Sequence, residues 1–260
     1  MRSKRFTFAV TFLLLTLFCH ASAYALGFGV RANYWLPAFD GKLQVDHEGV
    51  EGTEIKLKDD LDIKNDNIPF VEGYVGVGDH ELTFMYAYVN CTGEKTISKD
   101  MVFDGNVFYA NARVDSSFKA NIFDLEYQYK LVNFNAILAG VSLGLLLRVK
   151  YIDGEVNLYS NTAGSNNDIK ENLNLPIPMV GGAVKLGILA NILEARVKGA
   201  GMAYSGHYFY DVMGDVALTP FPFINIHGGY RMMSFKIDGI SDIYASMTFH
   251  GPYVGVKVGF

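Results

Sequence analysis

Apolar and polar residues alternate with a period of two through most of the chain after residue 25. In the first such segment one face carries Leu26, Phe28, Val30, Ala32, Tyr34 and Leu36, and the other carries Gly27, Gly29, Arg31, Asn33 and Trp35. Because successive side chains of a strand point to opposite faces, this period indicates strands with two chemically different faces. Helical periodicity is scarce, so the pattern predicts an all-β fold.

Composition narrows the classes of protein that fit this alternation. Half of the 260 residues are hydrophobic, whereas charged residues make up only 19%, below the ~25% that is usual for soluble domains. After the first 25 residues, no apolar run approaches the ~20 residues of a membrane-spanning helix. The chain is therefore either a large soluble β domain or a membrane protein that crosses the bilayer with strands.

Residues 1–25 have the features of a secretory signal peptide. The basic start consists of Arg2, Lys4 and Arg5, and an apolar stretch follows from Phe6 to Phe18. Small residues then permit cleavage after Ala23 or Ala25. We expect one domain, spanning residues 26–260, in the exported chain.

Charge and cysteine content exclude several functions. The sequence has 22 Lys and Arg against 27 Asp and Glu, and removal of the signal peptide takes away three of the basic residues. The mature chain is therefore acidic, which argues against nucleic acid as a partner. Cys91 is the only cysteine after the signal peptide, so an intrachain disulfide is excluded, and we expect no cofactor.

The lengths of the connections indicate the architecture. Ten strands are predicted, at residues 26–36, 68–77, 80–92, 116–130, 134–152, 174–188, 191–204, 207–219, 222–237 and 243–260. Short links are expected at 78–79, 131–133, 189–190 and 220–221, longer loops at 37–67, 93–115 and 153–173, and tight turns near 205–206 and 238–242. With both termini on one side, every short link falls on that side, which is typical of a transmembrane antiparallel up-and-down β-barrel. Eight strands are the alternative if two weaker segments are not strands.

The two strand faces favour a membrane barrel over a soluble sandwich. Residues 123–130 place Phe123, Leu125, Tyr127 and Tyr129 on one face, and Asp124, Glu126, Gln128 and Lys130 on the other. A barrel in lipid is apolar outside and tolerates polar groups inside. Several predicted strands also exceed the usual five or six residues and match the ~9–11 that cross a bilayer at a tilt.

The C-terminus ends in Tyr-Val-Gly-Val-Lys-Val-Gly-Phe. This ending resembles the C-terminal assembly signal of Gram-negative outer-membrane β-barrel proteins. The resemblance implies an outer-membrane location among lipid and lipopolysaccharide, and recognition by the barrel-assembly machinery through Tyr253, Val256, Val258 and Phe260. Residues 55–63 are similar to an acidic Leu-x-Asp-Asp-Leu stretch of small uncharacterised barrels of this kind, which implies no functional residues. We expect a monomer.

The strand pattern places a set of charges inside the barrel. The basic members are Arg31, Lys130, Arg148, Lys150, Lys185, Arg196, Lys198, Arg231 and Lys257, and the acidic members are Glu72, Glu81, Asp124, Glu126, Glu194, Asp211 and Asp215. Because an unpaired buried charge is costly, we expect ion pairs. Ten strands enclose a mostly filled interior. The interior is therefore either an interlocked polar core or a narrow path for ions or small solutes.

Catalytic and metal-binding signals are weak. His207 and Asp211 share a strand face and form the one pair that fits a hydrolase, and the mature chain lacks the His-x-Ser arrangement typical of outer-membrane lipid-A deacylases. The segment from Asp40 to Asp66 is acidic, so it could gather Ca²⁺, although it lacks a dedicated calcium-loop pattern. The sequence therefore predicts a non-enzymatic, structural or small-pore outer-membrane barrel whose external loops contact the surroundings. A hydrolase and a soluble periplasmic lipid-binding barrel are the alternatives.

Overall fold

The computed structural model describes residues 26–64, 67–136, 138–162, 165–189, 192–240 and 242–260, so the expected signal peptide lies outside the described residues. Ten antiparallel strands close into a barrel, because the strand at residues 26–35 pairs with the strand at 68–77 on one side and with the strand at 243–259 on the other. The predicted all-β, ten-stranded barrel is confirmed, and the eight-stranded alternative is wrong.

Ten long strands form the wall, and short elements fill one end of it. The wall consists of β1 (Leu26–Trp35), β4 (Ile68–Val77), β5 (His80–Thr96), β8 (Arg113–Asn135), β9 (Ala139–Thr162), β10 (Ser165–Ile188), β11 (Leu193–Tyr204), β12 (His207–Phe221), β13 (Ile224–Ile240) and β14 (Ile243–Gly259). The short elements are β2 (Ala38–Val45), β3 (Ile55–Lys56), α2 (Leu57–Leu61), β6 (Met101–Phe103) and β7 (Asn106–Phe108). No helix among the described residues is long and apolar enough to cross a membrane.

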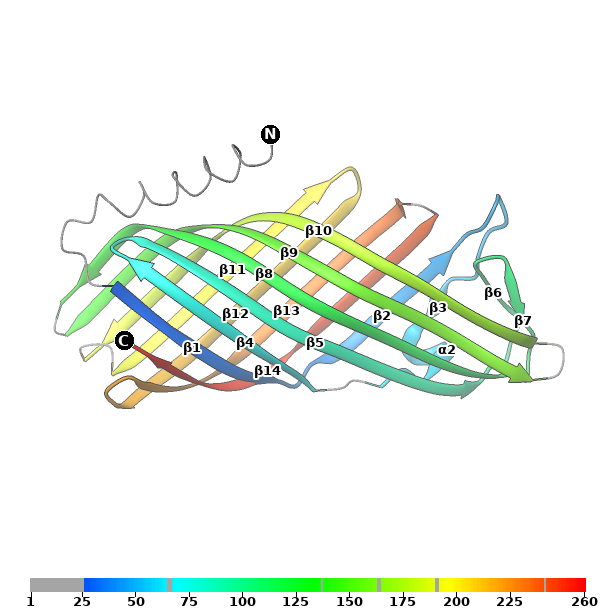
Figure 1. Ribbon diagram of the computed structural model, residues 1–260, viewed down its shortest axis with the longest axis horizontal. Helices are drawn as coiled ribbons and strands as arrows, with labels where there is room; N and C mark the ends of the chain where they lie inside the picture. Colours follow the sequence, from blue (N-terminus) through cyan, green and yellow to red (C-terminus); the bar gives the residue numbers. More distant parts are fainter. Residues whose placement is uncertain (1–25, 65–66, 137, 163–164, 190–191, 241) are drawn as a thin grey trace, which may run out of the picture.

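The two ends of the barrel differ. In Figure 1 the start of β1 and the C-terminus lie at the left, which we call the near end, and α2, β6 and β7 lie toward the right, which we call the far end. The short β4–β5 turn also lies at the near end, as the pairing of Val77 with His80 requires when β1 starts there. The short turn thus lies at the near end and the longer connecting segments lie at the far end, as the connection lengths predict.

Several of the expected connections are wrong. Residues 153–173 do not form a loop, because β9 and β10 stay paired from Thr162 and Ser165 to the near end. The link at 131–133 is a bulge instead, with a register shift between Lys130 and Val132, and β8 continues to Asn135. Residues 93–115 likewise contain the end of β5, the β6–β7 hairpin and the start of β8.

Both faces of β8 change character at the same point. Toward the near end, Leu125, Tyr127 and Tyr129 are exposed on the outer face, and Asp124 and Glu126 are buried on the inner face. Toward the far end the arrangement is reversed. The inner face there carries Val114, Phe118, Ala120 and Ile122, and the outer face carries Arg113, Asp115, Ser117, Lys119 and Asn121. The phase of the apolar alternation thus flips between Ile122 and Phe123.

Three neighbouring strands show the same flip. It follows Tyr88 in β5, Tyr151 in β9 and Met179 in β10. Phe123 pairs with Tyr151 across the β8–β9 ladder, and Tyr88 pairs with Asn121, so the flips in β5, β8 and β9 lie at nearly one level. We call the part of the molecule on the near-end side of these flips the near half and the remainder the far half. The expectation of a polar interior throughout is therefore wrong for the far half.

A hydrophobic core fills the far half. The loop between β1 and β4 contributes Ile55, Leu57, Leu61 and Ile63, and the β6–β7 hairpin contributes Met101, Phe103 and Phe108, all of them buried. These side chains pack with the inner faces of the wall strands, including Leu158 and Phe249. The long strands and the loops thus form one packed unit at this end.

Hydrogen bonds join the far-half loops to one another. Thr53 N donates to Val102 O at 2.8 Å, and Val102 N donates to the Thr53 hydroxyl at 2.9 Å. His47 Nδ1 lies 2.9 Å from Asp104 Oδ1, which connects the first loop to the β6–β7 turn. The loops are therefore held in a fixed arrangement over the far end.

The hydrogen bonding of the wall is interrupted at two places, both on the far-end side of the near half. β2 continues β1 along β14 after a break at Leu36 and Pro37, where a Cβ on Gly251 would lie 2.1 Å from Leu36 O. Only glycine permits this approach of the two backbones. On the opposite side, β10 pairs with β11 only from Val180 to Ile188. The rest of β10, toward the far end, pairs with β9 alone.

Candidate functional site

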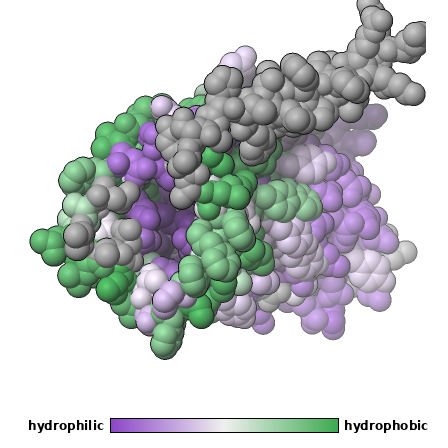
Figure 2. Space-filling view, turned by 60° about the vertical axis from the view of Figure 1, so that its left-hand side comes forward, coloured by the Kyte–Doolittle hydropathy of each residue, from purple (hydrophilic) through white to green (hydrophobic). Residues whose placement is uncertain are grey.

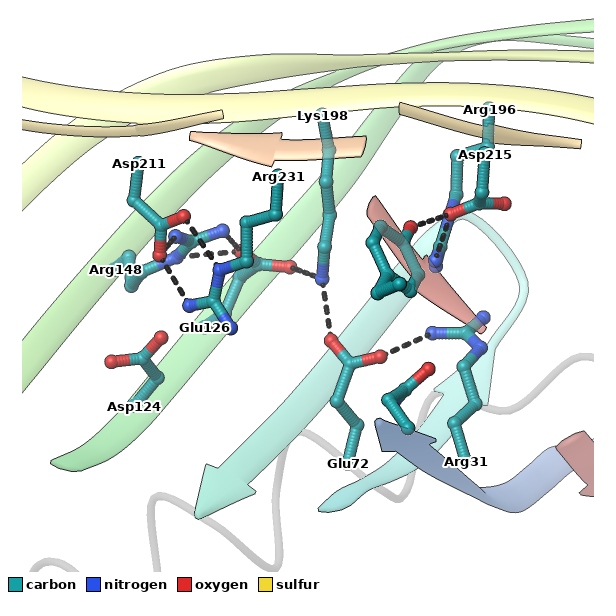
Figure 3. Close-up of polar contacts among 12 residues, drawn as sticks. Arg31, Glu72, Asp124, Glu126, Arg148, Arg196, Lys198, Asp211, Asp215 and Arg231 are labelled. Atoms are coloured by element: carbon teal, nitrogen blue, oxygen red, sulfur yellow. Dashed lines mark hydrogen bonds and ion pairs between the residues drawn. The ribbon is translucent and has the colours of Figure 1, made fainter. Parts of the chain in front are cut away.

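A continuous chain of ion pairs crosses the interior of the near half (Figure 3). Arg31 lies 3.5 Å from Glu72, and Lys198 bridges Glu72 at 3.0 Å and Glu126 at 3.2 Å. Arg148 Nε then donates to Glu126 Oε2 at 2.8 Å, and a second guanidinium nitrogen also contacts this oxygen. These side chains come from β1, β4, β8, β9 and β11, so the chain of contacts ties opposite sides of the wall together.

Asp211 on β12 is the centre of this network. Its carboxylate accepts from Arg148 at 3.1 Å and from Arg231 at 2.8 and 3.0 Å, and it lies 3.2 Å from Lys150. Lys150 is fully buried and also binds both oxygens of Asp124, at 2.7 and 2.8 Å. Because three buried cations share one carboxylate, this position contributes strongly to the charge balance of the interior.

Aromatic rings separate the ionic layer from the apolar far half. The Arg231 guanidinium lies 5.1 Å from the Trp35 ring centre and 4.9 Å from the Phe70 ring centre. The Lys150 ammonium lies 5.8 Å from the Phe209 ring centre. Cations at such distances are attracted to the ring faces, so the boundary between the ionic and apolar layers is itself stabilising.

A second polar cluster lies closer to the near end. Asp215 accepts from Arg196 at 2.7 and 3.1 Å and from the Tyr253 hydroxyl at 2.5 Å. His227 Nε2 lies 2.7 Å from Asn33 Oδ1, so this histidine has an amide rather than a carboxylate beside it. The cluster belongs to the wall of a cavity and supplies its polar surface.

The near end opens into a polar cavity of about 220 Å³, which we call the vestibule. Its charged lining consists of Arg31, Lys130, Lys185, Arg196, Lys198 and Lys257, with Glu81, Glu126, Glu194 and Asp215. Figure 2 shows the hydrophilic interior framed by hydrophobic residues at this end. The pairs Lys185–Glu194, at 2.7 Å, and Lys130–Glu81, at 4.0 Å, also line the vestibule. The vestibule ends inward at Glu126 and Lys198, members of the ion-pair chain.

The structure brings most of the sequence-predicted interior charges together. Arg31, Glu72, Asp124, Glu126, Arg148, Lys150, Lys198, Asp211 and Arg231 form the central chain. Arg196 and Asp215 form the second cluster, whereas Glu81, Lys185 and Glu194 pair at the vestibule wall. The interior also uses Asn33, Tyr74, Trp35 and Phe70, which charge counting did not select. Their inward position in the alternation was the available signal.

The structure does not bring His207 and Asp211 together as a hydrolytic pair. His207 Nδ1 accepts the backbone N–H of Asp238 at 3.0 Å, whereas Asp211 is surrounded by Arg148, Lys150 and Arg231. Four residues of one strand also separate the two by roughly 13 Å along the backbone. His227 is likewise engaged by Asn33. Each group therefore has a structural partner other than a nucleophile.

Metal ligands do not converge in the described part of the chain, where no group of three His, Cys, Asp or Glu side chains is placed to hold an ion. In the acidic first loop, Asp60 accepts from Lys56 N at 2.9 Å, and Asp46 accepts from Gly52 N at 2.8 Å. These carboxylates organise the local backbone. Among the described residues of this loop, the structure therefore gives no geometry that supports a Ca²⁺ site.

The residues of the expected assembly signal divide between the two faces of β14. Val256, Val258 and Phe260 are exposed on the outer face, and the Phe260 ring lies 5.3 Å from Phe28 and 4.7 Å from Phe223. Tyr253 is buried inside, where it binds Asp215. Tyr253 therefore has a place in the interior polar cluster.

Comparison with known proteins gives a fold-level likeness. No family model matches the chain, and no curated protein matches it in sequence. Among solved structures, the outer membrane protease OmpT of Escherichia coli is similar over 90% of this chain and 98% of its own, at 11% identity and a TM-score of 0.47. Neisserial surface protein A is similar over 90% and 97%, at 13% identity and a TM-score of 0.37. Ail of Yersinia pestis, bound to a heparin analogue, is similar over 90% and 99%, at 10% and 0.35. The barrel architecture itself rests on the strand pairing of this chain.

Proposed function

We propose that the protein is an integral outer-membrane barrel without enzymatic activity, closed to solutes, whose far half is a folded projection on the cell surface. The near half would lie in the membrane among lipid and lipopolysaccharide, with the protein as a monomer. The far half would present its outer face and loops to a surface partner. The observation that carries this proposal is the flip in polarity on four neighbouring strands.

The outer face of the near half has the dimensions of a lipid-facing belt. On β9 the outward residues from Val141 to Tyr151 are all apolar or aromatic, and the next outward residues are Asp153 and Glu155. At ~3.3 Å per residue and a tilt of ~45°, this stretch rises roughly 25 Å, the height of the apolar band of outer-membrane barrels. A soluble lipid-binding barrel would instead place its apolar face inward all round.

The interior supports a closed barrel rather than a pore. The vestibule ends at the ion-pair chain, and the next layer toward the far end contains Trp35, Phe70, Phe209 and Phe249, all buried. Beyond them lie the apolar side chains of α2 and of the β6–β7 hairpin. A hydrated ion would have to displace both the ionic and the apolar layers. Such a rearrangement is costly, since interiors pack densely.

A reconstitution experiment tests this function. The mature chain should fractionate with outer membranes and migrate differently on SDS gels before and after boiling. In planar bilayers it should give no discrete conductance steps at protein loads where a porin gives many. Steady unitary steps would contradict the closed barrel and favour the small-pore alternative, and recovery in the soluble periplasm would contradict the membrane location.

A second experiment addresses the C-terminus. We propose that Val256, Val258 and Phe260 are presented to the assembly machinery, since all three are exposed on the outer face of the last strand. Deletion of Phe260 should lower the amount of heat-modifiable protein in outer membranes, while refolding of the purified variant in detergent should be nearly unchanged. Equal losses in cells and in detergent would show that Phe260 matters through its contacts with Phe28 and Phe223 instead.

A further inference from the structure

Two cations face each other at the wall of the vestibule. Arg31 on β1 and Lys257 on β14 are direct partners in the β1–β14 register. Both charged groups lie over the same ring, with the Arg31 guanidinium 4.9 Å and the Lys257 ammonium 5.0 Å from the centre of Tyr74. Like charges directly opposite each other on paired strands are destabilising. This arrangement therefore requires compensation.

The protein supplies only part of that compensation. The carboxylate nearest to Arg31 is Glu72, at 3.5 Å, and Glu72 is bound more closely by Lys198, at 3.0 Å. Among the described residues, no carboxylate lies within 4.0 Å of the Lys257 ammonium. The ring of Tyr74 offsets some of the charge, since a cation at an aromatic face is attracted to the ring, but less strongly than to a close ionic partner in a buried site.

The other charges at the vestibule are already committed. Glu194 is held by Lys185 at 2.7 Å, and Glu81 lies 4.0 Å from Lys130. The Phe260 carboxyl group also lies at this end, where its oxygen accepts the Phe28 N–H at 3.1 Å, and it forms no ion pair with Arg31 or Lys257. The six basic and four acidic side chains of the lining leave an excess of positive charge.

The space beside this cation pair suits a small ligand. The vestibule measures about 220 Å³, far above the ~10–15 Å³ that one water requires. Arginine binds oxyanions through a planar fork of donors, and lysine adds a compact charge with three donors. We propose that the vestibule binds a small free oxyanion, a phosphate or a carboxylate, between Arg31 and Lys257. The site follows from the cavity and its charges and does not depend on whether the far half contacts a surface partner.

Calorimetric titration of the full mature chain in a zwitterionic detergent tests the site, with inorganic phosphate as the probe and ionic strength held constant with chloride. The wild type should show saturable binding. Lys257→Met, which keeps the length of the side chain and removes its charge, should weaken phosphate binding at least tenfold, and Lys257→Arg should retain most of it. Competition with acetate should show whether carboxylates share the site.

Lys236→Met is the matched control. Lys236 is a partly exposed lysine on β13, near its far end, whose ammonium is paired with Asp238 at 2.9 Å, so its loss should leave phosphate binding unchanged. Folding of each variant is checked by its shift on SDS gels with and without boiling. Absence of saturable binding in the wild type, or equal binding by Lys257→Met and Lys236→Met, would overturn the proposal.

The unfolding midpoint in phosphate-free buffer gives a readout that is independent of the ligand. Because Lys257 opposes Arg31, Lys257→Met should raise the unfolding midpoint in low-salt, phosphate-free buffer, and added phosphate should reverse the order of the two proteins. A midpoint below that of the wild type in phosphate-free buffer would show that Lys257 is already compensated within the protein. That result would also overturn the proposal.

Discussion

The near and far halves of the barrel are built from the same strands but distribute polar and apolar side chains in opposite ways between the inner and outer faces. On β8, Asp124 and Glu126 are buried inside while Leu125 and Tyr127 are exposed, and a few residues earlier Ile122 is buried while Lys119 is exposed. The near half thus pairs charges within and presents apolar groups outward, whereas the far half has the order of a water-soluble protein. In the proposed membrane placement, this change in side-chain order marks where the surrounding solvent changes from lipid to water.

The two halves also depend on different interactions. The near half is specified by charge-assisted hydrogen bonds, which are strong when satisfied and costly when one partner is missing. The far half is specified by packing of α2 and the β6–β7 hairpin against the wall, where the cost of a change depends on the cavity it leaves. Substitutions should therefore have different consequences in the two halves.

Removal of the Asp211 carboxylate should have the largest effect. Asp211→Asn leaves Arg148, Lys150 and Arg231 buried with one fewer negative charge, and the loss of one partner of a buried ion pair costs about 3–5 kcal/mol. We expect the free energy of unfolding of the whole barrel in detergent to fall by this amount, measured by urea titration. Asp238→Asn removes an exposed carboxylate paired with Lys236 and should leave the free energy of unfolding nearly unchanged. Equal effects of the two would contradict the role of Asp211 as the centre of the network.

Truncation in the far-half core should come next. Leu61 in α2 is 1% exposed, and Leu→Ala changes at such sites cost about 2–5 kcal/mol. Because Leu61 lies in the loop that covers the far end, we expect Leu61→Ala to raise the rate of proteolysis within residues 46–64 while the shift on unboiled gels persists. Val50→Ala, at an exposed position of the same loop, should change neither. Loss of the gel shift in Leu61→Ala would show that the two halves unfold together.

The sequence predicted the near half well, for a physical reason. Alternation with a period of two, together with short links at one end, determines the strands and the identity of the interior charges. It does not determine the contacts, because Asp211 gathers Arg148, Lys150 and Arg231 from two other strands, β9 and β13, through closure of the barrel. Nothing in the local sequence indicates which cations share a carboxylate.

The far half was predicted poorly because its polarity follows a different rule. Residues 153–173 are rich in polar groups. In a chain whose strands are expected to face lipid, such a polar segment indicates a loop rather than a strand. The missed signal was the change of phase, since Ile152, Val156 and Leu158 continue the apolar series of β9 on the other face. Sequence alone shows such a flip, but the loop segments that cover the newly apolar face are brought there only by the fold.

A lysine placed on the outer face should locate the boundary between the two solvents. Leu147 and Tyr159 both face outward on β9, with 57% and 41% of their surface exposed. Leu147→Lys should destabilise the barrel by about 2–4 kcal/mol in phospholipid vesicles, as expected for a charge near the middle of the bilayer. Tyr159→Lys should cost less than about 0.5 kcal/mol, since it lies beyond the flip. Guanidinium unfolding in vesicles measures both, and similar costs would contradict a boundary after Tyr151.

The smallest expected effect concerns the pH response of the first far-half loop. Asp46 accepts from the side-chain amide of Gln44 at 3.0 Å and from Gly52 N at 2.8 Å. These hydrogen bonds lower the pKa of the Asp46 carboxyl from its ordinary value of 3.8. Since the pKa is lower in the folded loop, the stabilisation is present at neutral pH and is lost as the pH falls through the folded pKa.

This loss should remain local, because Asp46 lies at the exposed end of β2 and outside the ion-pair network. Protection of the Gly52 amide from hydrogen exchange should decrease below about pH 4 relative to that of Thr53 N, which donates to a backbone carbonyl. Asp46→Asn retains an acceptor but not the charge, so it should show weaker protection of Gly52 with no such pH dependence. If Gly52 and Thr53 lost protection together as the pH fell, the expectation of a local loss would be wrong. Protonation would then open the whole loop, and the loop would unfold together with the far-half core.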